Sequence, residues 1–136
     1  MLVLFSFLLM IDQATKFWAR GHAGSVGLDI AQNTGIAFGL FQNNTLAIIA
    51  LNILFLSALW FVRKRYFSAS KWQEAGLLFV LAGGTSNCLD RIVRGYVVDF
   101  IHFEPIPTFN VADVWVNVGV ALLIIHALLN ARHHRT

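Results

Sequence analysis

Hydrophobic residues are concentrated in four stretches of the chain, each about as long as a helix that crosses a membrane. The stretches cover residues 1–20, 46–62, 74–93 and 111–130. A helix needs ~20 predominantly apolar residues to cross the roughly 30 Å of hydrocarbon in a bilayer. The pattern therefore predicts an all-α membrane protein with four transmembrane helices.

The first stretch is unusual because its uninterrupted apolar run ends at Ile11. If the helix continues to residue 20, Asp12 and Lys16 lie on one face, with the acid N-terminal to the base, which favours an ion pair. A cleaved signal peptide is the alternative, but no basic segment precedes the run and no A-x-A site follows it closely. The longer helix with its ion pair is the prediction.

The pattern changes between residues 21 and 45, where five glycines interrupt any helix. Apolar residues recur there with strand-like spacing, at Leu28, Ile30, Ile36 and Phe38. These features predict a small β-rich module on the extracytoplasmic face of the membrane.

A second irregular region joins the third and fourth stretches. Gly95 is predicted to end the third helix, and residues 96–101 are extended and apolar enough to pack at the membrane interface. Pro105 and Pro107 are the only prolines in the chain. They predict that residues 102–109 form a stiff loop rather than a helix.

The composition supports a membrane protein. With 57% hydrophobic and 12% charged residues and a mean hydropathy of +0.67, the chain is too apolar for an ordinary water-soluble domain. One domain, residues 1–136, is expected. The net charge of +3 comes without a long basic run, which favours anionic lipid headgroups over nucleic acid as the partner. The single Cys88 excludes an intramolecular disulfide, and no cofactor or metal is expected from the spacing of potential ligands.

Basic residues predict the orientation, because cytoplasmic loops carry an excess of Lys and Arg. Four basic residues lie between the second and third stretches and two lie in the C-terminal tail, which places both termini in the cytoplasm. On the opposite side, Lys16, Arg20, Arg91 and Arg94 are predicted to pair with carboxylates or lipid phosphates.

Four aspartates, Asp12, Asp90, Asp99 and Asp113, lie in or beside the apolar stretches. A carboxylate there is unfavourable by roughly 2.5–3.5 kcal/mol, so it usually has a function. Asp113 follows Asn110 at the spacing of an N-cap residue and an N3 acid, which gives it a possible structural role as well. Asp99 lies within an extended apolar segment. If Asp99 and Asp113 meet, they would share one proton and could activate a water molecule to hydrolyse an amide.

Five short blocks that contain these residues resemble, in order, the motifs of bacterial lipoprotein signal peptidase, the signal peptidase II family. The blocks are DQATK at 12–16, NTGIAF at 33–38, GGTSNCLDR at 83–91, GYVVDF at 95–100 and FNVAD at 109–113. No single block is specific, but the ordered set is.

The resemblance implies an aspartic endopeptidase of the bacterial cytoplasmic (inner) membrane, multi-pass, with both termini in the cytoplasm and the active site near the outer face. It implies cleavage of prolipoproteins before the diacylglyceryl-modified cysteine, contact with membrane lipid, and inhibition by globomycin-type peptides; the enzyme is expected to be a monomer. The catalytic pair would be Asp99 and Asp113. The residues expected to bind substrate or support the site are Asn33, Asn87, Asp90, Arg91, Asn110, Asp12 and Lys16.

Two departures from the family pattern bear on the site. Ser86 stands before Asn87 where the family usually has glycine, so the packing of the third helix is expected to differ locally. The connection from Asp99 to Asp113 is shorter than is common, so residues 102–109 are expected to cover the site less fully if they close over it.

Two other functions remain as alternatives. A small polytopic channel or proton-coupled carrier subunit would use Asp12, Asp90 and Asp113 to line a path, although such residues should lie near mid-membrane rather than near one face. An intramembrane serine protease would use Ser86 with His126, but these two residues are expected near opposite ends of their helices.

Overall fold

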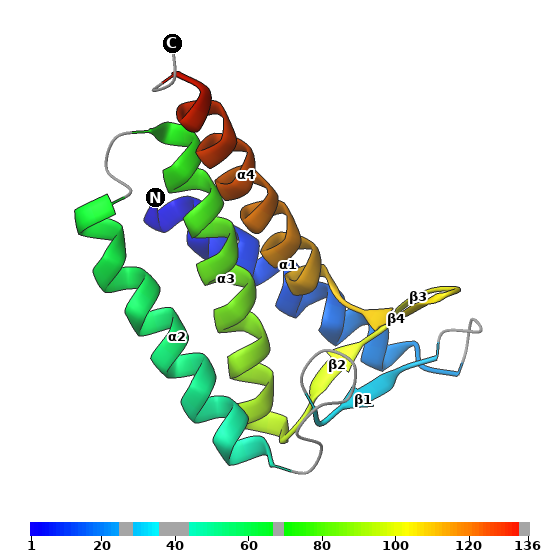
Figure 1. Ribbon diagram of the computed structural model, residues 1–136. Helices are drawn as coiled ribbons and strands as arrows, with labels where there is room; N and C mark the ends of the chain where they lie inside the picture. Colours follow the sequence, from blue (N-terminus) through cyan, green and yellow to red (C-terminus); the bar gives the residue numbers. More distant parts are fainter. Residues whose placement is uncertain (25–28, 36–43, 67–69, 134–136) are drawn as a thin grey trace.

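The computed structural model describes residues 1–24, 29–35, 44–66 and 70–133. It contains four helices and four short strands, and Figure 1 shows their arrangement. In chain order they are α1 (Leu2–Gly21), β1 (Ala31–Asn33), α2 (Thr45–Tyr66), α3 (Lys71–Arg94), β2 (Val97–Asp99), β3 (Ile101–Phe103), β4 (Ile106–Phe109) and α4 (Val111–His133). The four predicted helices are confirmed; α1 is as long as its apolar stretch, and the other three are slightly longer than theirs.

Three of the helices, α1, α2 and α4, are long and apolar enough to cross a membrane. The fourth, α3, is as long as the others at 24 residues but is more polar. It lies in the middle of the bundle and contacts each of the other three helices. The polar side chains of α3 are therefore shielded by neighbouring helices, while α1, α2 and α4 present apolar side chains outward.

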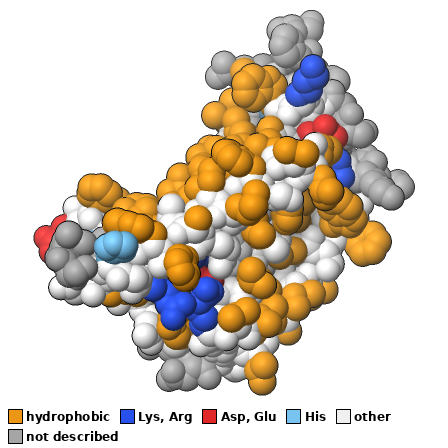
Figure 2. All heavy atoms as spheres, turned by 180° about the vertical axis from the view of Figure 1, so that it is seen from behind, with side chains coloured by type: hydrophobic (Ala, Val, Ile, Leu, Met, Phe, Trp, Pro, Cys, Tyr) orange, Lys and Arg blue, Asp and Glu red, His pale blue; other side chains and the backbone are white. Residues whose placement is uncertain are grey.

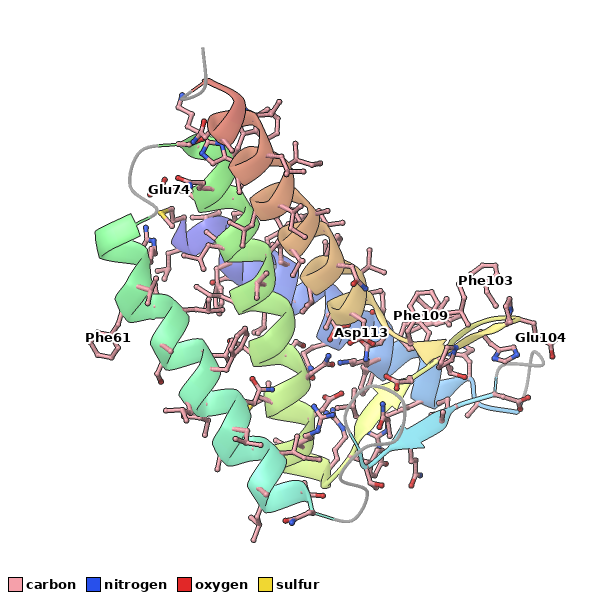
Figure 3. All side chains as sticks on the ribbon, in the orientation of Figure 1. Phe61, Glu74, Phe103, Glu104, Phe109 and Asp113 are labelled. Carbon is pink, nitrogen blue, oxygen red and sulfur yellow. The ribbon has the colours of Figure 1, made fainter. Side chains whose placement is uncertain are left out.

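The outer surface of the bundle is strongly apolar. Leu46, Leu54 and Phe61 of α2 are 81%, 67% and 77% exposed, and Phe61 points away from the other helices in Figure 3. Figure 2 shows hydrophobic side chains over most of the helical surface, with one group of basic side chains beside the strands. Such a large exposed apolar area is suited to contact with lipid.

Glycines allow α3 and α4 to approach closely. A Cβ atom on Gly76 would lie 2.9 Å from the carbonyl oxygen of Gly119, and one on Gly83 would collide with the carbonyl oxygen of Ala112. Small residues at a helix contact let the backbones approach in this way. The contact fixes the first turn of α4 against the middle of α3.

The strands form two antiparallel pairs at one end of the helices. In the first pair β1 lies against β2, with Ala31 opposite Asp99. The strand β1 is the described part of the predicted β-rich module, whereas Leu28, Ile36 and Phe38 lie outside the described residues. Gly95 ends α3 with φ of 82°, a left-handed conformation that favours glycine, as predicted.

Residues 102–109 are not the predicted loop but most of a hairpin formed by β3 and β4. Pro107 lies within β4, which pairs only with β3 in the described part of the chain. An edge strand tolerates proline because the missing N–H can face away from the partner strand. Phe103 and Phe109 stack across the hairpin with ring centroids 6.4 Å apart (Figure 3). This cross-strand contact helps to hold the two strands together.

Both chain termini lie at the end of the bundle opposite the strands (Figure 1). Glu74 is at the terminal end, whereas Asp113 and Glu104 are at the strand end (Figure 3). Asp113 and Glu104 thus lie at the end of the molecule away from the termini.

Candidate active site

Asp113 and Asn110 form the start of α4. The Asn110 Oδ1 atom accepts a hydrogen bond of 3.0 Å from the Asp113 backbone N–H, and the Asp113 Oδ2 atom accepts one of 3.1 Å from the Asn110 backbone N–H. These reciprocal bonds are those of a capping box and confirm the predicted helix start. They fix one oxygen of the Asp113 carboxylate.

Asp99 is the last residue of β2 and is only 2% exposed. Its Oδ1 atom accepts a 2.6 Å hydrogen bond from the Asn110 Nδ2 atom, and its Oδ2 atom accepts a 3.0 Å bond from the Asn33 Nδ2 atom. Pairing of β1 with β2 brings Asn33 beside Asp99 although the two residues are 66 positions apart. Asn110 therefore contacts both Asp99 and Asp113, which brings the two predicted carboxylates into one site.

Burial raises the pKa of Asp99 from 3.8 to about 6, and the negative charge of Asp113 adds to this effect. Hydrogen bonds from Asn33 and Asn110 act in the opposite direction because they favour the ionised carboxylate. The net result is a carboxyl group that can hold or release a proton near neutral pH. Such a group is suited to acid–base chemistry.

Asn87 lies on α3 and connects this pair to the interior of the bundle. Its Nδ2 atom donates a 2.8 Å hydrogen bond to the Asp113 Oδ1 atom. Its Oδ1 atom accepts from the Lys16 Nζ atom at 2.9 Å and from the Asn110 Nδ2 atom at 3.2 Å. Asparagine amides thus hold both oxygens of Asp99 and one oxygen of Asp113.

Asp12, Lys16 and Asp90 form a buried charged cluster behind Asn87, and the side chain of each is 0% exposed. The Lys16 Nζ atom lies 2.7 Å from the Asp12 Oδ2 atom and 3.0 Å from the Asp90 Oδ2 atom, which confirms the predicted ion pair on α1. Arg94 also pairs with Asp90. The carboxylates of Asp12 and Asp90 are thus neutralised by basic side chains within the bundle.

Asp12 also reaches the N-terminal end of α4. Its Oδ1 atom accepts a 2.7 Å hydrogen bond from the backbone N–H of Ala112, the residue before Asp113. A carboxylate at the first turn of a helix satisfies a free backbone donor and interacts favourably with the helix dipole. Asp12 therefore positions the helix start that carries Asp113.

Arg91 is 8% exposed and contacts backbone rather than the expected carboxylate or phosphate. Its two terminal nitrogens donate to the carbonyl oxygens of Gly35, at 2.6 Å, and Asn87, at 3.5 Å. Planar guanidinium groups can hold two separate acceptors in this manner. Arg91 links the turn after Asn33 to α3, so its contribution to the site is to hold this turn in place.

Ser86 and Gln13 are structural neighbours that were not predicted as site residues. The Ser86 Oγ atom donates a 2.6 Å hydrogen bond to Asp12 and accepts a 2.8 Å bond from the Gln13 Nε2 atom, which also lies 3.1 Å from the Asp90 Oδ1 atom. Gln13 lies inside the first motif block, which was the available signal, whereas Ser86 stands where the family usually has glycine. Ser86 is 0% exposed and bound to Asp12, which argues against the alternative of a serine nucleophile.

A cavity of about 640 Å³ lies next to the strand that carries Asp99. Phe100, which follows Asp99, and Ala31, which pairs with it, both line this cavity. The remaining lining comes from the end of α1, the two residues before β1 and the hairpin: Trp18, Asp29, Ile30, Ile101, His102, Phe103 and Thr108. Among the described residues, no group of three or more His, Cys, Asp or Glu side chains could hold a metal ion.

Comparisons with known proteins agree with this arrangement. The family model for Signal peptidase (SPase) II matches residues 4–129. A lipoprotein signal peptidase of Clostridium novyi (strain NT) is 33% identical, covering 88% of this chain and 91% of the relative. Another, from Fusobacterium nucleatum subsp. nucleatum, is 34% identical, covering 97% of this chain and 88% of the relative.

The fold is also similar to that of solved structures. One, described as a bacterial membrane enzyme determined by the in meso method at 2.3 Å resolution, superposes with a TM-score of 0.88 at 25% identity, covering 99% of this chain and 90% of the other. A second bacterial membrane enzyme, at 1.9 Å resolution, gives a TM-score of 0.84 at 25% identity, covering 93% and 91%. The chain belongs to the signal peptidase II family of aspartic peptidases.

Proposed function

We propose that this protein removes signal peptides from prolipoproteins and that Asp99 and Asp113 are its catalytic residues. One observation carries this proposal: the end of β2 and the first turn of α4 each contribute a carboxylate, and the Asn110 side chain is bonded to both residues. The names of the relatives in Clostridium novyi and Fusobacterium nucleatum support the choice of substrate.

The chemistry that we propose needs one ionised and one protonated carboxyl group. The ionised group takes a proton from water while the water oxygen bonds to the scissile carbonyl carbon, and the other group protonates the carbonyl oxygen. The resulting tetrahedral intermediate then breaks its C–N bond as the group that took the proton from water protonates the amine. The other group, now a carboxylate, takes a proton from a hydroxyl of the intermediate, which leaves a carboxylic acid as the second product. The raised pKa of Asp99, about 6, supports a pair that holds a single proton near neutral pH.

Asparagines would keep the pair in place during this reaction. Asn33 and Asn110 hold Asp99, while Asn87 and the Asn110 backbone hold Asp113. The supporting roles expected for the remaining site residues fit their contacts: Asp12 binds the first turn of α4, Lys16 binds Asn87, Asp90 pairs with Lys16, and Arg91 binds the turn after Asn33.

We infer that the substrate carries a diacylglyceryl group on the cysteine that follows the cleaved bond. The acyl chains would remain in the bilayer, so the site should lie near a membrane surface. Its position at the strand end of the helices supports this inference. Placement of that end at the outer face of the bacterial inner membrane, with both termini in the cytoplasm, fits the basic residues between α2 and α3. We also propose that the enzyme is a monomer and that globomycin-type peptides inhibit it.

The test is cleavage of a diacylated prolipoprotein by the purified protein. Asp99→Asn and Asp113→Asn should each abolish formation of the shortened product, because an amide cannot exchange a proton with water as a carboxylate does. Glu104→Gln is the matched control, since Glu104 is an exposed acid in the turn of the hairpin (Figure 3). Normal turnover by either aspartate variant would exclude the pair as the catalytic residues.

A further inference from the structure

Each asparagine at the proposed catalytic pair has its side-chain oxygen bound to a group that can only donate. The Asn33 Oδ1 atom accepts from the Gly35 backbone N–H at 3.0 Å, and the Asn110 Oδ1 atom accepts from the Asp113 backbone N–H at 3.0 Å. Asn87 is held instead by the Lys16 ammonium, at 2.9 Å. Since the oxygen of each amide is fixed, its NH₂ group must face the carboxylates.

Asn87 differs from the other two asparagines in the origin of its anchor. Asn33 and Asn110 are fixed by backbone within three residues of themselves, but Asn87 is fixed by a side chain 71 positions away, on α1. The ammonium of Lys16 has three donors, and it contacts three acceptors: Asp12, Asp90 and Asn87. Every donor of this fully buried group therefore has an acceptor.

Reversal of the Asn87 amide would be unfavourable at both of its ends. Its NH₂ group would then face the Lys16 ammonium, and its carbonyl oxygen would face the Asp113 carboxylate. The same reversal would break the 3.2 Å bond from Asn110 to the Asn87 oxygen. Inside a site with little water, an unsatisfied polar contact of this kind is costly.

We propose that Lys16 is a positioning residue for catalysis, whose ammonium sets the direction of the Asn87 amide and thereby keeps an N–H donor on Asp113. The proposal rests on the proposed function, because it assumes that Asp113 is catalytic. It assigns Lys16 a purpose beyond stabilising the packing of α1 against α3. The ion pairs with Asp12 and Asp90 hold the ammonium in place, and Asn87 transmits its effect to the reacting carboxylate.

A double-mutant cycle on the purified full-length protein tests this assignment, with cleavage of a diacylated prolipoprotein as the readout. Lys16→Met keeps the length of the side chain and removes the donors, while Asn87→Ala removes the amide. Each single change should lower kcat on the order of a hundredfold with little change in KM, because the catalytic group is misplaced rather than the substrate. Adding Lys16→Met to Asn87→Ala should change kcat by less than about twofold, because the group through which Lys16 acts is already absent.

Gln13→Leu is the matched control. Gln13 lies on the same helix and donates hydrogen bonds to Ser86 and Asp90 on α3 but, within the part of the chain that the structure describes, none to Asn87. Loss of its bonds should lower the melting temperature with kcat retained. If Gln13→Leu lowers kcat as much as Lys16→Met, or if the effects of Lys16→Met and Asn87→Ala multiply, Lys16 has only a structural role and the proposal is wrong.

A further variant covers the case in which Lys16→Met does not fold. The double change Lys16→Met with Asp12→Asn removes both members of the ion pair on α1, while Asp90 keeps Arg94 as its partner. We expect this protein to fold with a kcat well below that of Asp12→Asn alone, whereas equal kcat values for the double variant and Asp12→Asn would overturn the proposal. Failure of the proposed function itself is distinguishable, because the wild-type protein would then give no product.

Discussion

Asp99 shows how burial and hydrogen bonding act in opposite directions on one carboxyl group. Removal from water favours the neutral acid, and two asparagine N–H donors favour the carboxylate. Burial has the larger effect, so the pKa rises to about 6. The group is thereby kept close to the point at which it can exchange a proton, while the two asparagines prevent it from moving.

The raised pKa of Asp99 predicts a specific dependence of stability on pH. The folded protein keeps this proton up to about pH 6, but the unfolded chain loses it near pH 3.8, so raising the pH between these values destabilises the fold. The full loss is roughly 3 kcal/mol as an upper limit, from the shift between 3.8 and about 6. The melting temperature in detergent should fall between about pH 4 and about pH 7, and less so for Asp99→Asn. Parallel curves for the two proteins would contradict the prediction.

Asp12→Ala should mainly lower stability. The change leaves Lys16 and the Ala112 N–H without a partner at Asp12, and breaking a buried ion pair typically costs about 3–5 kcal/mol. We expect a clear fall in melting temperature with some residual cleavage, compared with Asp29→Ala, which changes an exposed acid. A fully stable but inactive Asp12→Ala protein would instead indicate a direct part in catalysis.

At the scale of helices and strands, the contact between α3 and α4 determines where Asp113 lies. Gly119→Val should destabilise the protein, because a Cβ atom at Gly119 would already lie 2.7 Å from the Val80 Cγ2 atom and 2.8 Å from the Val80 backbone nitrogen. Overpacking of this kind costs about 1–3 kcal/mol. Gly21→Ala is the control, since a Cβ atom there has no neighbour within 4 Å among the described residues. Equal melting temperatures for both variants and the wild type would rule out this close contact.

Local sequence rules predicted much of this architecture and part of the site. Apolar runs predicted the helices, and Gly95 predicted the end of α3. The spacing of Asn110 and Asp113 predicted the start of α4. Each of these features depends on neighbours within a few residues. Contacts between distant segments were not predicted from spacing. The bond from Asn33 to Asp99 depends on the register of β1 against β2, and the hairpin at β3 and β4 depends on a cross-strand aromatic contact.

The five motif blocks identified some of the residues that make these contacts between distant segments. They selected Asn33, Asn87 and Arg91 as site residues without giving the contacts of any of them. Gln13 lay inside a block but was not selected, and its bonds to Ser86 and Asp90 became visible only when α1 was packed against α3. The resemblance therefore predicted which residues lie at the site, and the structure shows which of their atoms form hydrogen bonds.

For the whole molecule, the position of the site relative to the apolar surface determines how substrate arrives. The helices expose apolar side chains to lipid, and the strand end carries both proposed catalytic residues. A precursor anchored by acyl chains would already be concentrated at this level of the membrane, since each buried CH₂ contributes about 0.8 kcal/mol.

We therefore expect that removing the acyl chains from a prolipoprotein raises its KM by at least about tenfold. The measurement compares diacylated and unmodified forms of one precursor with the purified protein in lipid vesicles. A soluble peptide spanning the cleavage site serves as the control for access to the site from water. Equal cleavage of the two precursors would mean that the lipid is not recognised.

The polar character of α3 has a consequence for how the protein is made. An isolated α3 would bring Asp90, Arg91 and Arg94 to the bilayer with part of their charge unpaired. They lie in its last turns, so each costs less than the roughly 2.5–3.5 kcal/mol of a charge at the middle of a membrane. Lys16 of α1 supplies a counter-ion for Asp90, and α1 is synthesised first. We therefore expect α1 to insert into the membrane first and α3 to insert beside it. In a chain made without α1, we expect α3 to fail to insert.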